Sequence, residues 1–133
     1  MLAGSCLCGS VAYEVDAPAG PIVHCHCRTC RKTHGSAFSS VTNVPRERFR
    51  VVKGEELLNA FESSPGKFRK FCSRCGSHIV AERVSQPTVL LRLGCLDTQI
   101  DDKPRAHIWR SDAASWYDPK LELPEFPESP QRK

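Results

Sequence analysis

Seven of the eight cysteines in this chain fall into two groups with short internal spacings. The first group joins a Cys-x-Cys-Gly motif to a distant Cys-x-x-Cys-Gly motif, and its members are Cys6, Cys8, Cys72 and Cys75. A Cys-x-x-Cys-Gly turn directs two sulfurs at one point, and the glycine lets backbone amides face the thiolates. Four thiolates close a tetrahedral zinc shell. The pattern therefore predicts a structural zinc site rather than four unrelated buried thiols.

The second group nests a Cys-x-Cys and a Cys-x-x-Cys motif, and its members are Cys25, Cys27 and Cys30. Three sulfurs so close in sequence can hold one metal ion from a single loop and leave a fourth position for a reacting molecule. A thiol bound there would be deprotonated and become a nucleophile at neutral pH. The alternative is a second closed site in which a nearby histidine is the fourth ligand. We predict that these three cysteines form a catalytic, more labile zinc site.

Two histidines and the eighth cysteine bear on that alternative. Because alternate side chains of an extended segment point in opposite directions, His26 is expected to point away from Cys25 and Cys27 and to pack or form a hydrogen bond. His34 could reach the second group or carry a proton. Cys95 follows an apolar stretch, and we interpret it as a small buried side chain rather than a ligand.

Basic residues accompany both cysteine groups. Arg28 and Arg31 lie beside the second group and could bind the carboxylates of an anionic thiol, although a solvated helix face would also explain them. Two further basic groups occur in the middle of the chain: Arg46, Arg48, Arg50 and Lys53, and then Lys67, Arg69 and Lys70. Few aromatic residues are interleaved with them, which favours ordinary surface charge over nucleic-acid contacts.

Length and composition limit the classes of function. The chain has 133 residues, the size of one domain, with 40% hydrophobic and 26% charged residues and a formal net charge of +4. No apolar run approaches the roughly 20 residues of a membrane span, and the first residues do not resemble a secretory signal. We therefore expect a cytoplasmic protein, a monomer or homodimer, whose thiols bind metal instead of forming disulfides. The mild charge suits an anionic small molecule at least as well as nucleic acid, which usually requires a denser basic patch.

The elements that must position these residues are mostly strands. Residues 1–118 are expected to form one domain, and residues 119–133, with four prolines, an extended tail whose last residues are disordered. A short helix is expected at 28–32. Strands are expected at 10–15, 38–44, 48–52, 57–61, 67–71, 78–82 and 88–95, with residues 63–66 as a hairpin turn. Many short strands predict a mainly β fold, either a sandwich or a folded-over sheet. We expect Val11, Tyr13 and Val15 to share one strand face, the arginines of residues 46–50 to share another, and Phe61 to lie in the core. Trp109 could close the sheet or line a pocket rim.

Five segments of the chain together resemble a known family. They are residues 4–13 (GSCLCGSVAY), 25–31 (CHCRTCR), 71–77 (FCSRCGS), 93–97 (LGCLD) and 107–109 (HIW). In this order they resemble the glutathione-dependent formaldehyde-activating enzymes, a family that also contains centromere protein V. The resemblance implies an Mss4-like, zinc-stabilised β fold with a structural zinc on the first cysteine group and a labile zinc on the second, near a glutathione site. It also implies formation of S-hydroxymethylglutathione from glutathione and formaldehyde.

The leading hypothesis is a zinc-dependent carbon–sulfur lyase or synthase that acts on a small thiol adduct, with glutathione as the thiol. In this hypothesis the second cysteine group is the reaction site, and Arg28 and Arg31 orient the anionic substrate. A non-enzymatic zinc module that binds nucleic acid or a protein partner is the main alternative, and a releasable zinc or redox site is a third.

Overall fold

The computed structural model describes residues 1–130 and places their strands in two sheets. The smaller sheet has the order β1-β2-β5, all antiparallel, and consists of β1 (Leu2–Ser5), β2 (Ala12–Val15) and β5 (Phe49–Lys53). The larger sheet has the order β10-β3-β4-β9-β8-β7-β6. Its strands are β3 (Ile22–Cys25), β4 (Ser39–Pro45), β6 (Leu58–Ser64), β7 (Lys67–Cys72), β8 (His78–Arg83), β9 (Thr88–Arg92) and β10 (Ala106–Ile108). The prediction of a mainly β fold is confirmed.

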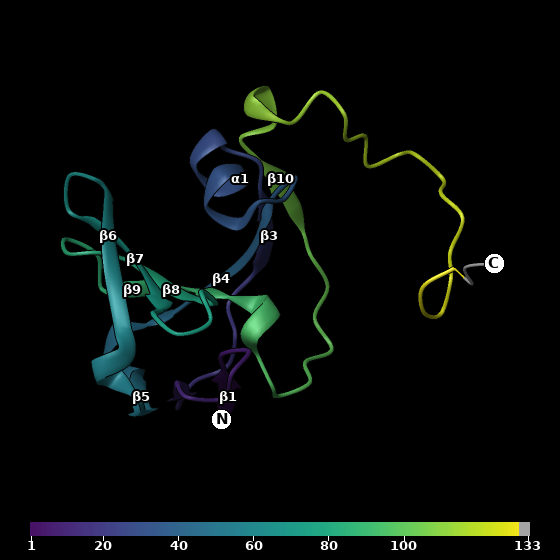
Figure 1. The fold of residues 1–133 in the computed structure, drawn as a ribbon. Coiled ribbons are helices and arrows are strands. Elements are labelled where there is room, and N and C mark those ends of the chain that lie inside the picture. Colours follow the sequence, from purple (N-terminus) through teal and green to yellow (C-terminus); the bar gives the residue numbers. More distant parts are fainter. Residues whose placement is uncertain (131–133) are drawn as a thin grey trace.

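The larger sheet is antiparallel except at one edge, where β10 runs parallel to β3. The predicted hairpin is confirmed, because β6 pairs with β7 around a turn in which Gly66 has φ +77°. The one α-helix in the described part of the chain, α1 (Arg28–His34), follows β3 after two residues, contacts β4, and stands at one end of β3 in Figure 1. It extends two residues beyond the predicted end and stops at Gly35, which has a left-handed conformation.

Three predicted details are wrong. The strand expected at 88–95 ends at Arg92, and a 3-10 helix, η3 (Leu93–Cys95), follows it. A second 3-10 helix, η1 (Arg46–Arg48), replaces the start of the strand expected at 48–52, so the arginines of that segment do not share one strand face. Phe61, expected in the core, is 64% exposed because β6 is an edge strand with a single neighbour. Two more 3-10 helices are η2 (Glu55–Leu57) and η4 (Arg110–Asp112).

The hydrophobic core combines residues of the two sheets. As the alternation predicted, Val11, Tyr13 and Val15 are all buried, and they belong to one cluster with side chains of β4, β8 and β9. Tyr13 also packs on the ring of Phe49, with 5.3 Å between the ring centroids. Gly4 lies against Tyr13 so closely that a Cβ atom there would clash with the phenol ring. The core therefore requires the N-terminal strand to lie close to the rest of the protein.

The C-terminal part of the chain leaves the sheets after η4. Residues 119–130 are exposed, contain no helix or strand, and extend away from both sheets in Figure 1. The division of the chain at residue 118 and the Mss4-like character of the fold stay predictions, and the expected disorder of the last residues concerns 131–133, which lie outside the described residues. Within residues 1–130, no helix has the length and apolar character needed to cross a membrane.

Candidate metal centres and candidate active-site cleft

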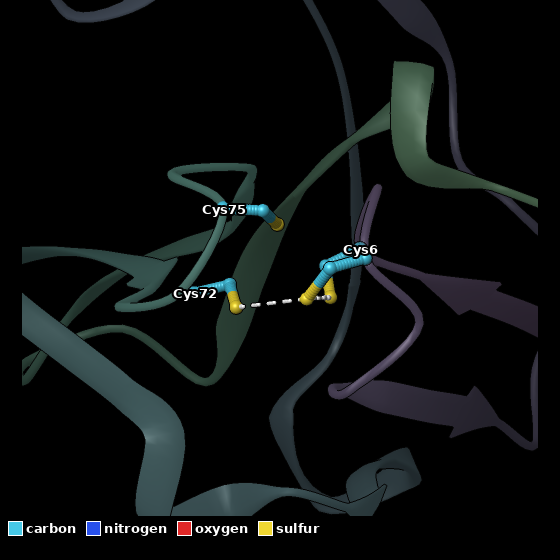
Figure 2. Close-up of side chains that lie close together, drawn as sticks. Cys6, Cys72 and Cys75 are labelled. Atoms are coloured by element: carbon cyan, nitrogen blue, oxygen red, sulfur yellow. Dashed lines mark hydrogen bonds between the residues drawn. The ribbon is translucent and has the colours of Figure 1, made fainter.

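The first cysteine group is assembled from both sheets. Cys6 and Cys8 follow β1, whereas Cys72 ends β7 and Cys75 lies in the turn before β8. Figure 2 shows the side chains of Cys72 and Cys75 pointing toward the side chain of Cys6. All four sulfurs lie within 4.8 Å of one another, and the Cys6–Cys8 and Cys8–Cys72 sulfur separations are 3.6 and 3.9 Å. Tetrahedral Zn–S bonds of about 2.3 Å require sulfurs about 3.8 Å apart, so the group fits zinc.

The backbone around these four cysteines is shaped to stabilise thiolates. Gly9 and Gly76 have φ values of +77° and +81°, the left-handed conformation expected after each motif. The backbone N–H of Val11 donates to the Cys6 sulfur at 3.2 Å. Hydrogen bonding from Ser77, whose hydroxyl lies 3.3 Å from the sulfur, lowers the pKa of Cys75 to about 5. The donor set therefore suits a cation that joins the N-terminal segment to the β7–β8 turn.

The second cysteine group is formed where β3 passes into α1. Cys25 ends β3, Cys27 is the N-cap of α1, and Cys30 lies in its first turn, where its N–H donates to the Cys27 sulfur at 3.3 Å. The three sulfurs lie within 4.8 Å of one another, and no ligand atom of another His, Cys, Asp or Glu from residues 1–130 joins them. Cys25 and Cys30 are buried, whereas Cys27 is partly exposed. Hydrogen bonding from Cys25 lowers the pKa of Cys30, and Ser39 and Arg69 act in the same direction.

His26 and His34 contact other aromatic rings and do not join the sulfurs of the second cysteine group. His26 is fully buried and its Nε2 lies 2.8 Å from Nδ1 of His107, so it packs and forms a hydrogen bond as expected. His34 packs its ring against that of His78, with 5.1 Å between the centroids. Burial, reinforced by the charge of Arg92, lowers the pKa of His34 to about 4, so this ring is neutral at pH 7.

A cleft of about 420 Å³ opens beside the second cysteine group, and all three of its cysteines line it. The cationic residues around the cleft are Arg28, Lys67, Arg69, Arg83 and Arg92. Arg31 is not among the lining residues; its Nη1 donates to the backbone oxygen of Asp112, a residue that lines the cleft, at 3.0 Å. Of the two arginines expected to bind substrate, the structure therefore places only Arg28 at the cleft.

Sequence reasoning missed the two most buried cations of the cleft, Arg69 and Arg92, which are 3% and 5% exposed. In the sequence, Arg92 stands out because it ends the otherwise apolar strand β9. Arg69 belongs to the basic segment that was interpreted as surface charge. Of the two places considered for Trp109, closing the sheet or lining a pocket rim, the structure favours the second, because Trp109 lines the cleft. Its φ of +59° is the one left-handed value of a non-glycine residue in the described chain, an unfavourable conformation for a bulky side chain.

The sequence of this chain matches a protein-family model. The model described as "Glutathione-dependent formaldehyde-activating enzyme" matches residues 1–112, which include both cysteine groups. The chain belongs to this family. The resemblance inferred from the five sequence segments is thereby confirmed.

Curated relatives carry the same family name at low identity. A Colletotrichum graminicola protein is 31% identical over 119 residues, and a Halomonas elongata protein is 30% identical over 125 residues; each alignment covers 87% of this chain. Both are named "Putative glutathione-dependent formaldehyde-activating enzyme". The alignments cover 56% of the first relative and 79% of the second, so this chain spans little more than half of the fungal protein.

A solved structure supports the fold independently. The crystal structure of a Rhodobacter sphaeroides protein superposes with a TM-score of 0.66 over 79% of this chain and 98% of that chain. At 23% sequence identity the likeness concerns the fold alone.

Proposed function

We propose that this family member is a zinc-dependent enzyme that forms or cleaves the carbon–sulfur bond of a small thiol adduct, with glutathione as the thiol and formaldehyde or a related aldehyde as the electrophile. The observation that carries the proposal is the three-cysteine group at the wall of a cationic cleft. Three thiolates are a fitting ligand set for a zinc ion that keeps one position for a reactant.

The two cysteine groups have different roles in this proposal. Cys6, Cys8, Cys72 and Cys75 hold a structural zinc with four protein ligands. Cys25, Cys27 and Cys30 hold the second zinc, which when bound would lower the pKa of a thiol that reaches it. Cys27 is the partly exposed member of the group, so the reacting thiol approaches from its side.

The other residues of the cleft contribute by positioning the reactants. The thiol sulfur forms a bond to the carbonyl carbon, and the carbonyl oxygen takes up a proton and becomes a hydroxyl. The reverse reaction breaks the same carbon–sulfur bond and releases the aldehyde. Arg28 lies next to Cys27 in sequence and lines the cleft, where its guanidinium can orient an anionic thiol. Trp109 lines the same cleft and presents an aromatic surface to the reactants.

Zinc content and adduct formation test the proposal together. The wild-type protein is expected to hold two zinc ions per chain and to release one on dialysis against glutathione. It should also accelerate the exchange between glutathione, formaldehyde and S-hydroxymethylglutathione, measured by NMR against the uncatalysed background. Two zinc ions that resist glutathione, together with exchange at the background rate, would contradict the proposal and favour a non-enzymatic zinc module.

A pair of cysteine variants locates the activity. Cys27→Ser is expected to lose the releasable zinc and the acceleration while the protein stays folded. Cys95→Ser is the matched control, because Cys95 lies outside both groups and its thiol donates to the backbone oxygen of His78. A Cys27→Ser variant that keeps the full acceleration would remove the second cysteine group from the mechanism.

A further inference from the structure

The cleft beside the second cysteine group has an excess of positive charge. Four of its cations, Lys67, Arg69, Arg83 and Arg92, make no ion pair with any acidic group of residues 1–130. Three thiolates around a divalent ion would carry one net negative charge. The four positive charges of these residues are more than enough to neutralise it. Asp112 is the acidic residue that lines the cleft. The cleft therefore has the charge of a receptor for an anion.

Arg92 is the clearest indication that the excess positive charge of the cleft serves to bind an anionic ligand. It is only 5% exposed, and its Nη2 atom is buried without a hydrogen-bond partner among the described residues. Burial lowers its pKa, since the charged form has lost much of its hydration. A buried guanidinium is costly unless it is paired, and unpaired buried charges concentrate at binding sites.

Arg69 is fixed in place beside the cysteines. It is 3% exposed, its Nε donates to the hydroxyl of Ser63 at 2.9 Å, and its Nη1 lies 3.7 Å from the Cys30 sulfur. These contacts hold the planar guanidinium in one orientation close to the cysteine group. A guanidinium held in this way can bind a carboxylate with little further loss of side-chain entropy.

Strand register explains why these residues meet. Residues directly opposite in neighbouring strands share a face of the sheet, as do residues two positions apart in one strand. By this rule Cys25 on β3 shares its face with Arg92 on β9, across β4. Across β8, Arg69 and Lys67 on β7 lie on that same face. The anion receptor and the cysteine group are thus parts of one continuous surface.

We propose that Arg69 and Arg92, assisted by Lys67, form an anion subsite beside the second cysteine group that selects thiols bearing a carboxylate. The inference rests on the proposed function, because it takes the cysteine group as the place where the thiol sulfur sits. It assigns selectivity mainly to two buried strand residues rather than to the arginines of α1. A neutral thiol of the same size would leave both guanidinium groups unpaired and bind more weakly.

Two thiols of equal length test the subsite by binding alone. The affinities of 3-mercaptopropionate and 3-mercaptopropionamide for the zinc-loaded protein are compared by calorimetry, since the pair differs only in the charge of its terminal group. Wild-type protein is expected to prefer the carboxylate by about tenfold or more, the range of charge-assisted hydrogen bonds. Arg92→Gln is expected to abolish this preference while the amide still binds.

Further variants keep the test decisive if Arg92→Gln does not fold. Lys67→Gln changes a partly exposed side chain at the same face and is expected to reduce the preference severalfold. Arg48→Gln is the matched control for loss of one positive charge, because Arg48 pairs with Asp16 and does not line the cleft. It should keep the wild-type preference. Equal affinities of wild-type protein for both thiols, or the same preference in Arg92→Gln and Arg48→Gln, would overturn the proposal.

The binding test also separates the subsite from the chemistry. A protein that prefers the carboxylate but leaves formaldehyde exchange at its background rate would keep the subsite and refute the proposed reaction. A protein that accelerates exchange equally with both thiols would keep the reaction and refute the subsite.

Discussion

Removing the proposed metal link between the N-terminal segment and the β7–β8 turn is expected to cost about 4 kcal/mol of unfolding free energy. The sulfurs of Cys8 and Cys72, 3.9 Å apart, belong to residues separated by 64 positions. A cross-link that closes a loop of this length lowers the entropy of the unfolded chain by an amount worth about 4 kcal/mol at about 25 °C. Domains are commonly stable by about 5–15 kcal/mol, so this loss is a large fraction of the total. The double variant Cys72→Ser/Cys75→Ser removes both ligands on one side of the link.

Urea unfolding followed by circular dichroism measures this loss. With a denaturant slope of about 2 kcal/mol per molar, the midpoint of the double variant should fall by about 2 M. Cys27→Ser and Cys95→Ser provide the comparison, because each removes a thiol without touching the link, and both should keep midpoints near that of the wild type. A double variant that unfolds at the same urea concentration as these controls would refute the assignment of a structural metal to the first cysteine group.

Two further substitutions test the core and one ion-pair network. Tyr13→Phe should stabilise the protein by about 1 kcal/mol in urea unfolding, because the buried hydroxyl has no partner among the described residues; a loss of stability would show that the hydroxyl is satisfied in solution. Burial alone would raise the pKa of Glu82, but Lys70 at 2.7 Å and Arg46 outweigh it, so that pKa is lowered on folding. Its stabilisation is therefore present above the unfolded pKa and lost as pH falls through the folded one. Glu82→Gln should cost about 1 kcal/mol near neutral pH and nothing in acid, and an equal cost at both pH values would contradict this.

The two cysteine groups could be predicted because each motif consists of residues close together in the sequence. A Cys-x-x-Cys-Gly motif specifies its own turn, and the left-handed φ of Gly76 is the value that such a turn requires. The pairing of two distant motifs followed from counting ligands, since neither pair can close a tetrahedral shell alone. The helix after the second group was recognisable for the same reason, because Gly35 ends it by a local rule.

Some strands escaped prediction because they carry little pattern of their own. β10 has three residues, all exposed, and it exists as a strand because it pairs in parallel with β3. β1 contains Gly4, which has low strand propensity, yet the close approach of Tyr13 makes a glycine necessary there. β10 depends on a strand that is remote in sequence, and β1 depends on the packing of a side chain from the next strand. Neither contact is visible in the residues of the strand itself.

The buried cations of the cleft could not be predicted for the same reason, because they meet through contacts between distant strands. Arg69 and Arg92 are 23 positions apart in the sequence, and only the register of β7, β8 and β9 brings them to one face. In the sequence, Arg69 is one of several basic residues before a cysteine motif, and Arg92 ends an apolar strand. What distinguishes them is burial, because a buried cation without an acidic partner has to be explained by a ligand, whereas an exposed one does not. The arginines of α1 were conspicuous in the sequence because they adjoin the cysteines, but proximity along the chain does not measure desolvation. The selectivity of the site is therefore expected to lie in the sheet, and its metal chemistry in the loop and helix that the sequence identified.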